Sequence, residues 1–217
     1  MRAVSAVLDL LYPRKCILCG ALLRREETDL CGDCRRETAE FCRYNRKIPN
    51  IADFTAVWYY EDQVRESLIR YKFYNQRSYA PAYGRMMALK VLEHLEMPDV
   101  ITWVPVSRRR KWERGYDQVE LLARAVGREL ALPVEKLLDK YRHNAAQSGL
   151  DSAAARRANV LGVYRPHQNA QIRGRRILLL DDILTTGATA SECARVLRTA
   201  GAEEIIFAAA AAGRNHE

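Results

Sequence analysis

The sequence predicts an α/β fold, in which a parallel sheet is flanked by helices and follows a small cysteine-bearing module. Three observations lead to this prediction. Strand-like apolar runs alternate with helix-like runs from residue 54 onward, and such alternation is typical of parallel sheets. Four cysteines in two C-x-x-C pairs lie upstream of the alternation. One apolar strand runs into two adjacent aspartates and a threonine-rich turn.

The bulk composition indicates a globular chain. Its 217 residues are 48% hydrophobic and 29% charged, which is enough for one standard domain plus a small appendage. No apolar run approaches the roughly 20 residues that a membrane helix needs, and residues 3–12 contain Asp9 and lack a small-residue cleavage site. We therefore expect a cytoplasmic protein without membrane insertion.

The chain divides near residue 50, at the end of a polar stretch that contains Pro49. We assign residues 1–50 to the N-terminal module, which starts with a short apolar helix, and residues 51–217 to the α/β domain. Apolar runs predict strands at residues 54–60, 100–106, 176–180 and 205–211. Helices are predicted at residues 63–73, 80–95, 116–130 and 189–199, the last closed by Gly201, with a loop at residues 142–150.

The N-terminal module contains two C-x-x-C pairs, Cys16 with Cys19 and Cys31 with Cys34. A C-x-x-C turn directs two sulfur atoms at one centre, and Zn²⁺ accepts four thiolates in a closed tetrahedron. Because no coordination position would stay open, the predicted zinc site is structural. Disulfides and unliganded thiols are the alternatives, and the expected absence of a secretion signal favours zinc. Cys42 lies outside the pattern and could replace a ligand in a distorted site.

The formal net charge of +8 is unevenly distributed. Residues 140–176 hold eight basic residues and one acidic residue, Asp151. This excess indicates an anionic ligand nearby, although a run of charge is also typical of a solvated face. Charge alone does not separate nucleic acid from pyrophosphate.

The segment after the strand at residues 176–180 has the composition of a sugar-phosphate site. Asp181 and Asp182 end the strand, and a threonine-rich turn leads into a helix. Backbone N–H groups at a helix N-terminus bind phosphate, and carboxylates accept hydrogen bonds from vicinal hydroxyls. The predicted phosphate-binding residues are Thr185, Thr186, Gly187, Ala188 and Thr189.

Three alternative motifs fit this segment less well. A Walker A loop needs Gly-Lys-Ser or Gly-Lys-Thr, and a dinucleotide-binding turn needs G-x-G-x-x-G, and the segment has neither. A receiver domain shares the apolar strand with paired aspartates, but it needs an acceptor aspartate and a lysine further on. The chain has no Asp after Asp182 and no Lys after Lys140.

The run ILLLDDILTTGAT at residues 177–189 resembles the thirteen-residue phosphoribosyl pyrophosphate motif of type I phosphoribosyltransferases. Together with the four cysteines, the stretch VPVSRRRKWERGYDQ at residues 104–118, and Gln147, Arg156 and Asn159, it makes the chain resemble the ComF family over nearly its whole length. The resemblance implies a type I phosphoribosyltransferase-like domain behind a zinc-finger-like module. It also implies a bacterial competence protein that handles imported single-stranded DNA during natural transformation.

The resemblance assigns roles to the sugar-phosphate segment. Asp181 and Asp182 would bind the ribose hydroxyls and take part in catalysis, and the residues from Thr185 to Thr189 would hold the 5′-phosphate. Magnesium would accompany phosphoribosyl pyrophosphate and neutralise its diphosphate. The reaction would be displacement of pyrophosphate at C1 of the ribose, helped by positioning and charge stabilisation.

The resemblance also implies two pyrophosphate contacts. The loop that starts at Val104 and Pro105 would contact pyrophosphate through a strained or cis peptide. Its matching residues are Val106, Ser107 and Arg108. Arg156 lies in the counterpart of a flexible loop that closes over the substrate, where its charge would stabilise departing pyrophosphate. His143 of the same loop is a candidate general base, although an exposed histidine is the more common finding.

The chain departs from the family's usual RGFNQ at Tyr116 and Asp117. An added carboxylate near a polyphosphate weakens binding unless a cation offsets it. We therefore expect Asp117 to support the site from behind its ligand-binding residues rather than to contact the ligand.

Two functional classes remain open. The protein is either a phosphoribosyl-transferring enzyme with an unknown acceptor, or a DNA-handling factor that uses the same pocket as a ligand-sensing module. The zinc module and the basic residues favour single-stranded DNA as a partner, with Arg173, Arg175 and Arg176 as predicted contacts. The family also implies a competence helicase or translocase as a partner. The complete ribose-phosphate motif favours retained binding of phosphoribosyl pyrophosphate.

Overall fold

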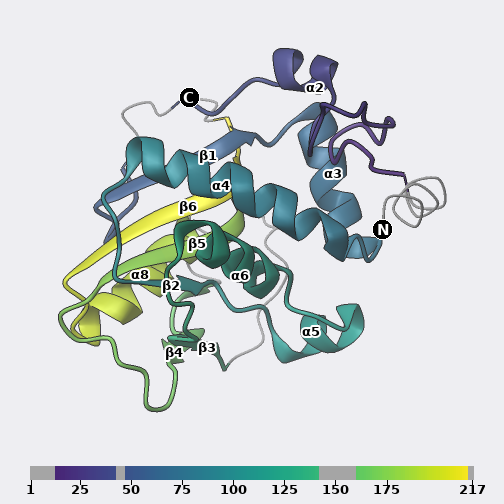
Figure 1. The fold of residues 1–217 in the computed structure, drawn as a ribbon. Coiled ribbons are helices and arrows are strands. Elements are labelled where there is room, and N and C mark those ends of the chain that lie inside the picture. Colours follow the sequence, from purple (N-terminus) through teal and green to yellow (C-terminus); the bar gives the residue numbers. More distant parts are fainter. Residues whose placement is uncertain (1–12, 43–46, 142–159, 215–217) are drawn as a thin grey trace.

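A four-stranded parallel sheet forms the centre of the computed structural model, which describes residues 13–42, 47–141 and 160–214 (Figure 1). The strand order is β1 (Asp53–Tyr59), β6 (Glu204–Ala212), β5 (Arg176–Leu184) and β2 (Val100–Trp103). Val134 adds a single parallel bridge to Ile101 at the β2 edge. The sheet confirms the predicted fold class.

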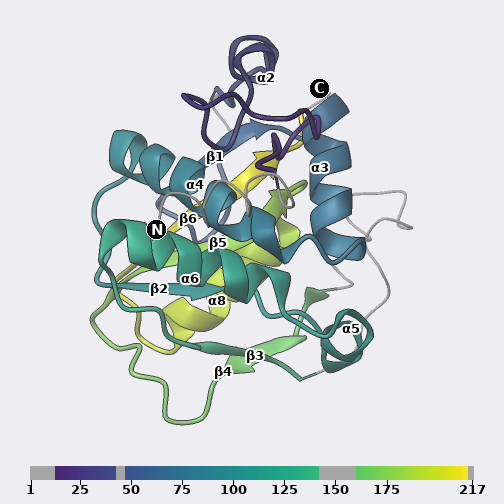
Figure 2. The ribbon, with the colours of Figure 1, turned by 45° about the vertical axis from the view of Figure 1, so that its right-hand side comes forward.

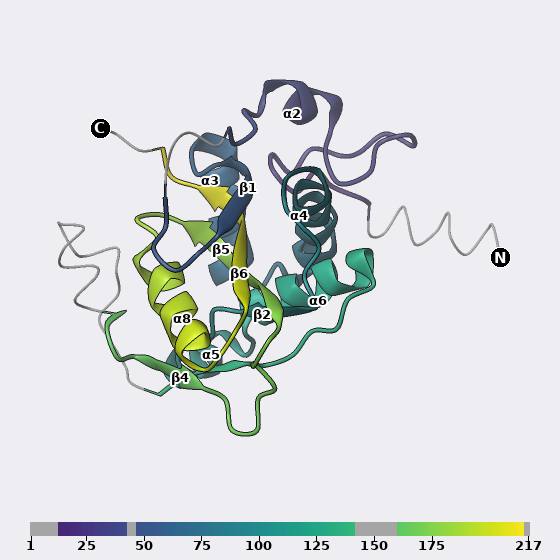
Figure 3. The same cartoon turned by 90° about the vertical axis from the view of Figure 1, so that its left-hand side faces the viewer.

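Helices cover both faces of the sheet. The helices α4 (Ala80–His94) and α6 (Gln118–Leu130) lie on one face, and α8 (Ala188–Thr199) lies on the other (Figure 3). Successive side chains of a strand point to opposite faces, so Leu178 and Leu180 pack into one core while Ile177 and Leu179 pack into the other. Because both faces are buried, β5 is apolar at every position from Ile177 to Leu180.

Three further helices lie in the connections between these elements. Helix α3 (Asp62–Phe73) follows β1 and packs into the same core as α4 and α6, and the one-turn helix η1 (Arg77–Tyr79) links α3 to α4. Helix α5 (Arg108–Arg114) lies between β2 and α6. A separate antiparallel pair, β3 (Leu138–Lys140) and β4 (Tyr164–Pro166), lies close to α8.

The N-terminal module lies against α3 and α4 (Figure 2). It contains the short helix α2 (Gly32–Glu37). Its apolar residues are buried in the core shared with α3, α4 and α6, and these residues are Ile17, Leu18 and Leu30. Ion pairs join the two parts as well, from Arg85 to Asp29 and from Lys90 to Glu40, the latter at 2.7 Å.

The predicted strands and helices are present in the described residues, with shifted ends. Strand β2 ends at Trp103 because the following residues leave the sheet, and β5 continues through Asp181 and Asp182 to Leu184. Helix α6 begins at Gln118, two residues later than predicted. The predicted helix at residues 3–12 and the loop at residues 142–150 lie outside the described residues.

Candidate functional site

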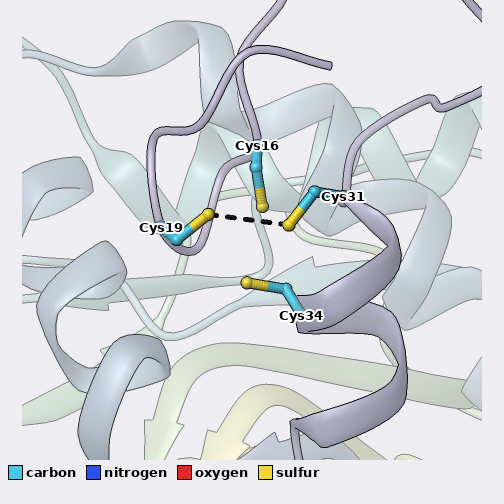
Figure 4. Close-up of side chains that lie close together, drawn as sticks. All are labelled: Cys16, Cys19, Cys31 and Cys34. Atoms are coloured by element: carbon cyan, nitrogen blue, oxygen red, sulfur yellow. Dashed lines mark hydrogen bonds between the residues drawn. The ribbon is translucent and has the colours of Figure 1, made fainter. Parts of the chain in front are cut away.

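Four cysteine side chains converge in the N-terminal module (Figure 4). The sulfur atoms of Cys16, Cys19, Cys31 and Cys34 all lie within 4.8 Å of one another, and Cys19 and Cys31 are 3.6 Å apart. Sulfur atoms about 2.3 Å from one tetrahedral zinc ion are about 3.8 Å apart. The four thiols therefore fit a structural zinc ion, as predicted from their spacing. Cys42 is exposed and is not part of this cluster.

Local hydrogen bonds shape each half of the cluster. In the first half, Gly20 N–H donates to the Cys16 carbonyl at 2.9 Å, and Gly20 has a φ of 79°, which favours glycine. Ala21 N–H points to the Cys19 sulfur at 3.5 Å. In the second half, Cys31 caps α2 and its carbonyl accepts from Arg35 N–H at 3.0 Å. These local bonds define the turn that carries each cysteine pair.

A cavity of about 950 Å³ opens at the carboxyl edge of β2 and β5. Ligands bind at this edge of parallel sheets, where the polar strand ends and the helix N-termini meet. Most of the predicted sugar-phosphate residues line it: Val106, Asp181, Asp182, Thr185, Gly187, Ala188 and Thr189. Thr186 is not among the lining residues, and its hydroxyl accepts from Ala188 N–H at 3.4 Å.

The two aspartates of β5 face opposite sides of the sheet because they are neighbours on one strand. Asp182 faces the α3 side, where its carboxylate lies 2.9 Å from the Lys72 ammonium and accepts from Gln118 Nε2 at 3.3 Å. Asp181 accepts from Asp182 N–H at 2.8 Å. Burial and the adjacent Asp182 charge raise the pKa of Asp181 well above its usual range. The acids therefore differ in environment although they are adjacent in sequence.

The turn between β5 and α8 has the geometry of an anion-binding helix start. Gly187 precedes the helix with a φ of 78°, a conformation that favours glycine, and α8 begins at Ala188. The N-cap Gly187 has no side chain to cap the helix, and the Thr186 hydroxyl accepts from Ala188 N–H at 3.4 Å. The first N–H groups of a helix have no partner within it, and they attract anions.

The loop after β2 approaches the cavity from the neighbouring strand. Val104 N–H donates to the Leu180 carbonyl at 2.9 Å, which keeps the loop beside β5. The described residues contain no cis peptide bond, so the Val104–Pro105 bond is trans. The Ser107 hydroxyl accepts from Arg110 N–H at 3.3 Å, so Ser107 caps α5, which begins at Arg108.

Asp117 holds this loop from behind. Its carboxylate caps α6 by accepting from Val119 N–H at 3.0 Å and from Glu120 N–H at 3.1 Å. It also accepts from Trp103 Nε1 at 3.3 Å and from Val106 N–H at 3.4 Å. Burial raises the pKa of Asp117. The contacts explain the carboxylate at this position, because it joins the end of β2 to the start of α6.

Four cations line the cavity: Lys72, Arg110, Arg114 and Lys140. Lys72 pairs with Asp182, but the other three form no ion pair with any carboxylate in the described part of the chain. The Arg114 guanidinium lies over the Phe73 ring at 4.7 Å, and burial lowers its pKa. Burial, with a contribution from Arg110, lowers the pKa of Lys140 to about 8. Unpaired cations that are partly desolvated indicate an anionic ligand.

The described basic residues of the run at residues 140–176 do not form one surface. Lys140 lines the cavity, whereas Arg175 pairs with Glu135 at 2.8 Å. Arg176 starts β5 at the opposite edge of the sheet and pairs with Glu204 at 2.9 Å. Arg156 and His143 lie outside the described residues. Lys72 and Arg110 were not predicted from the sequence as cavity residues, because the fold alone brings their helices to the cavity.

Comparisons with known proteins agree with the two parts of the fold. Residues 120–217 match the phosphoribosyl transferase domain model, and residues 7–45 match the double zinc ribbon domain model. Competence protein F of Haemophilus influenzae is 28% identical over 215 residues, with 88% of this chain and 93% of the relative covered. DNA utilization protein YhgH of Escherichia coli K12 is 30% identical over 200 residues, with 88% and 86% covered.

Two further similarities extend the comparison. Competence protein ComFC of Streptococcus pneumoniae is 26% identical over 224 residues, with 88% of this chain and 96% of the relative covered. The glutamine phosphoribosylpyrophosphate amidotransferase of B. subtilis superposes with a TM-score of 0.43 at 23% identity, covering 64% of this chain and 30% of that one. None of the described helices is long and apolar enough to cross a membrane.

Proposed function

The chain belongs to the ComF family, and on that premise we propose that its cavity binds phosphoribosyl pyrophosphate together with magnesium. The observation that carries the proposal is one cavity that holds two aspartates, the N-terminus of α8 and the cations Arg110, Arg114 and Lys140, which form no ion pair within the described residues. This ligand has a diphosphate, a ribose diol and a 5′-phosphate. The cations, the two aspartates and the start of α8 would complement these three parts in charge and hydrogen bonding.

We assign the 5′-phosphate to the start of α8, where backbone N–H groups and the hydroxyls of Thr185 and Thr189 surround the turn. The ribose hydroxyls would donate to Asp181 and Asp182. The diphosphate would lie toward Lys140 and the cationic residues of α5. Magnesium prefers oxygen ligands, and the diphosphate with an Asp181 carboxylate oxygen would supply them. Arg156 remains a proposed contact to the departing pyrophosphate.

Phosphoribosyl transfer to an acceptor is the activity that this arrangement favours. The cations would stabilise the negative charge that develops on pyrophosphate as its bond to C1 breaks. The phosphate turn and the acids would hold the ribose in place, so the acceptor would attack a positioned carbon. A binding module that senses the same ligand without transferring it is the alternative. Pyrophosphate release in the presence of candidate acceptors separates the two.

Replacing both acids tests the binding proposal. Calorimetry should show that Asp181→Asn with Asp182→Asn weakens binding of phosphoribosyl pyrophosphate and magnesium by at least about 100-fold, since each hydrogen bond to a charged group contributes about 1.5–3 kcal/mol. Glu129→Gln, an equivalent change at an exposed position of α6, is the matched control and should bind normally. Unchanged affinity in the double variant would remove the assignment.

A second proposed activity is binding of single-stranded DNA, which the surface of α5 favours. Trp112 is 86% exposed, and α5 also carries Arg109, Arg110, Lys111 and Arg114. Phe73, stacked with Arg114, and Tyr74 lie exposed at the end of α3. Unpaired bases stack on exposed aromatic rings while cations contact the phosphates. We call Arg109, Lys111 and Trp112 the α5 patch.

Fluorescence anisotropy with a labelled oligonucleotide tests the α5 patch. Trp112→Ala should weaken binding about five- to 100-fold with little change in salt dependence, because stacking contributes about 1–3 kcal/mol per base. Arg109→Ala with Lys111→Ala should flatten the salt dependence, whose slope is about −0.7 per neutralised phosphate. Arg175→Ala, at the opposite edge of the sheet, tests the contact predicted from the sequence, and we expect it to change both quantities less than the α5 variants do. If only Arg175→Ala weakened binding, the α5 patch would be excluded.

A further inference from the structure

Helix α3 contacts both the zinc cluster and the ligand cavity. Gln63 in its first turn, Ser67 in its middle and Arg70 in its last turn contact the cysteine module, and Lys72 in the same last turn contacts Asp182 at the carboxyl edge of the sheet. Arg70 and Lys72 are two residues apart, which is about 3 Å along the helix axis at 1.5 Å per residue. A displacement of this turn by the module would therefore also displace the cavity contact.

The side of α3 that faces the module holds the segment between the first two cysteines. The Ser67 hydroxyl and the Arg70 guanidinium donate to the Ile17 carbonyl, the latter at 3.3 Å, and Arg70 also donates to the Leu18 carbonyl. Gln63 Oε1 accepts from the Cys34 thiol at 2.9 Å, a bond that only the protonated, zinc-free thiol can donate. The Ile17 and Leu18 carbonyls lie between the ligands Cys16 and Cys19, so the conformation of the cluster determines whether their bonds to α3 exist.

The cavity end of α3 holds one acid and one wall of the proposed site. The Lys72 ammonium lies 2.9 Å from the Asp182 carboxylate, and both side chains are largely buried. The Tyr71 hydroxyl donates to the Gln118 carbonyl at 2.7 Å, and the Tyr116 hydroxyl donates to the Tyr71 carbonyl at 2.6 Å. A shift of α3 would therefore move Lys72 and release Asp182 and Gln118 together.

We propose that the zinc module controls ligand affinity in the cavity through α3, with Lys72 as the positioning residue. With zinc bound, the two halves of the cluster are joined and the Ile17 and Leu18 carbonyls anchor Ser67 and Arg70. Without zinc, four thiols lose their common ligand, and a module of this size depends on its metal for order. The anchor then weakens, α3 moves, and Lys72 no longer fixes Asp182.

This inference rests on the proposed function for the identity of the ligand, and thermodynamic linkage gives it a quantitative form. If zinc raises the affinity for phosphoribosyl pyrophosphate by some factor, the ligand must raise the affinity for zinc by the same factor. Coupling between sites of this kind is typically about five- to 150-fold. We expect a value within that range for the zinc-loaded and zinc-free forms of the whole chain.

Two binding measurements on the full chain test the coupling. Calorimetry gives the affinity for phosphoribosyl pyrophosphate and magnesium with and without zinc, and competition with a chromophoric chelator gives the zinc affinity with and without that ligand. Equal factors above about five in both directions support the proposal. A factor near one in a zinc-free protein that keeps its circular dichroism spectrum overturns it.

Arg70→Ala removes the guanidinium hydrogen bonds from α3 to the Ile17 and Leu18 carbonyls. It removes neither a zinc ligand nor a residue that lines the cavity. With its zinc content verified, this variant should bind phosphoribosyl pyrophosphate at least about fivefold more weakly than the parent, and its coupling factor should fall. Arg65→Ala removes an exposed arginine from the same helix and should retain both values. If zinc removal unfolds the whole chain, the comparison of these two zinc-loaded variants decides, and equal affinities overturn the proposal.

Hydrogen exchange without any ligand separates failure of this inference from failure of the proposed function. Arg70→Ala should speed amide exchange at the last turn of α3 and at Asp181 and Asp182, whereas Arg65→Ala should not. If the parent does not bind phosphoribosyl pyrophosphate but this exchange pattern appears, the ligand assignment fails and the α3 connection stands. If the pattern is absent, the α3 connection fails.

Discussion

Lys140 lies inside the cavity with its ammonium group 5.4 Å from the Tyr164 ring centre. Burial and the nearby Arg110 charge lower its pKa from 10.5 to about 8. Because the folded-state pKa lies below the unfolded one, the charged form opposes folding below about pH 8. Without a ligand, this group therefore adds stability as the pH rises from about 8 to about 10.5.

Ligand binding should have the opposite pH dependence at Lys140, because a diphosphate favours the charged form. Calorimetry between about pH 7 and about pH 9 should show weaker binding of phosphoribosyl pyrophosphate as the pH passes 8. Lys140→Arg should bind with an affinity that is nearly constant over this range, since arginine stays protonated. An identical pH profile in the parent and in Lys140→Arg would exclude Lys140 from the diphosphate contact.

The sequence predicted which residues form a site where the site lies within one short segment. It did not predict which side chains from other parts of the chain surround those residues. The C-x-x-C spacing predicted the zinc cluster because four positions within one short segment define it. The sequence also placed Asp181 and Asp182 side by side. It did not indicate that Lys72 of α3 forms an ion pair with Asp182. Lys72 and Asp182 are far apart along the chain, and only the packing of α3 brings them into contact.

Helices α4 and α6 approach closely at Gly84. A Cβ atom there would lie 2.4 Å from the Ala125 Cβ and 3.0 Å from the Ala125 carbonyl carbon. Gly84→Ala should therefore destabilise the protein by about 1–3 kcal/mol in denaturant unfolding, although alanine is the better helix former. Adding Ala125→Gly should restore part of this loss, while Ala125→Gly alone should cost about 1 kcal/mol. A Gly84→Ala variant as stable as the parent would show that the helices can separate freely.

The elements that sequence patterns missed are the short and exposed ones. Helix α5 consists mainly of basic residues, so it lacks the apolar stripe that marks a helix packed on a core. Strands β3 and β4 have three residues each, too few for an alternating pattern to appear. Strand β2 ends at Trp103 because Val106 N–H bonds to Asp117 instead of to the sheet, a contact that apolar content does not reveal.

At the scale of the molecule, alternation of strands and helices predicted a parallel sheet but not its strand order. Only β5 and β6 are neighbours both in sequence and in the sheet, whereas β1 and β2 lie at opposite edges. The predicted boundary at residue 50 follows the polar stretch before β1. That stretch gives no indication that Ile17, Leu18 and Leu30 are buried in the same core as α3 and α4.

The shared core leads to a prediction about the isolated C-terminal part. A fragment of residues 51–217 would lose Ile17, Leu18 and Leu30 from a core in which each is at most 4% exposed. Burial of an aliphatic side chain contributes about 1.5–3 kcal/mol, so the loss is on the order of 5–9 kcal/mol as an upper bound. Domains are typically stable by only about 5–15 kcal/mol.

We therefore expect the full chain with zinc to unfold in one cooperative transition, and the fragment to be partly unfolded or aggregated. Its buried Ser67 and Tyr83 hydroxyls, now 2.7 Å apart beneath the module, would face solvent with Leu68. Scanning calorimetry and size-exclusion chromatography measure both states. A monomeric fragment with the melting temperature of the full chain would show that the module is an independent domain, and that its apolar contacts with α3 and α4 contribute little to stability.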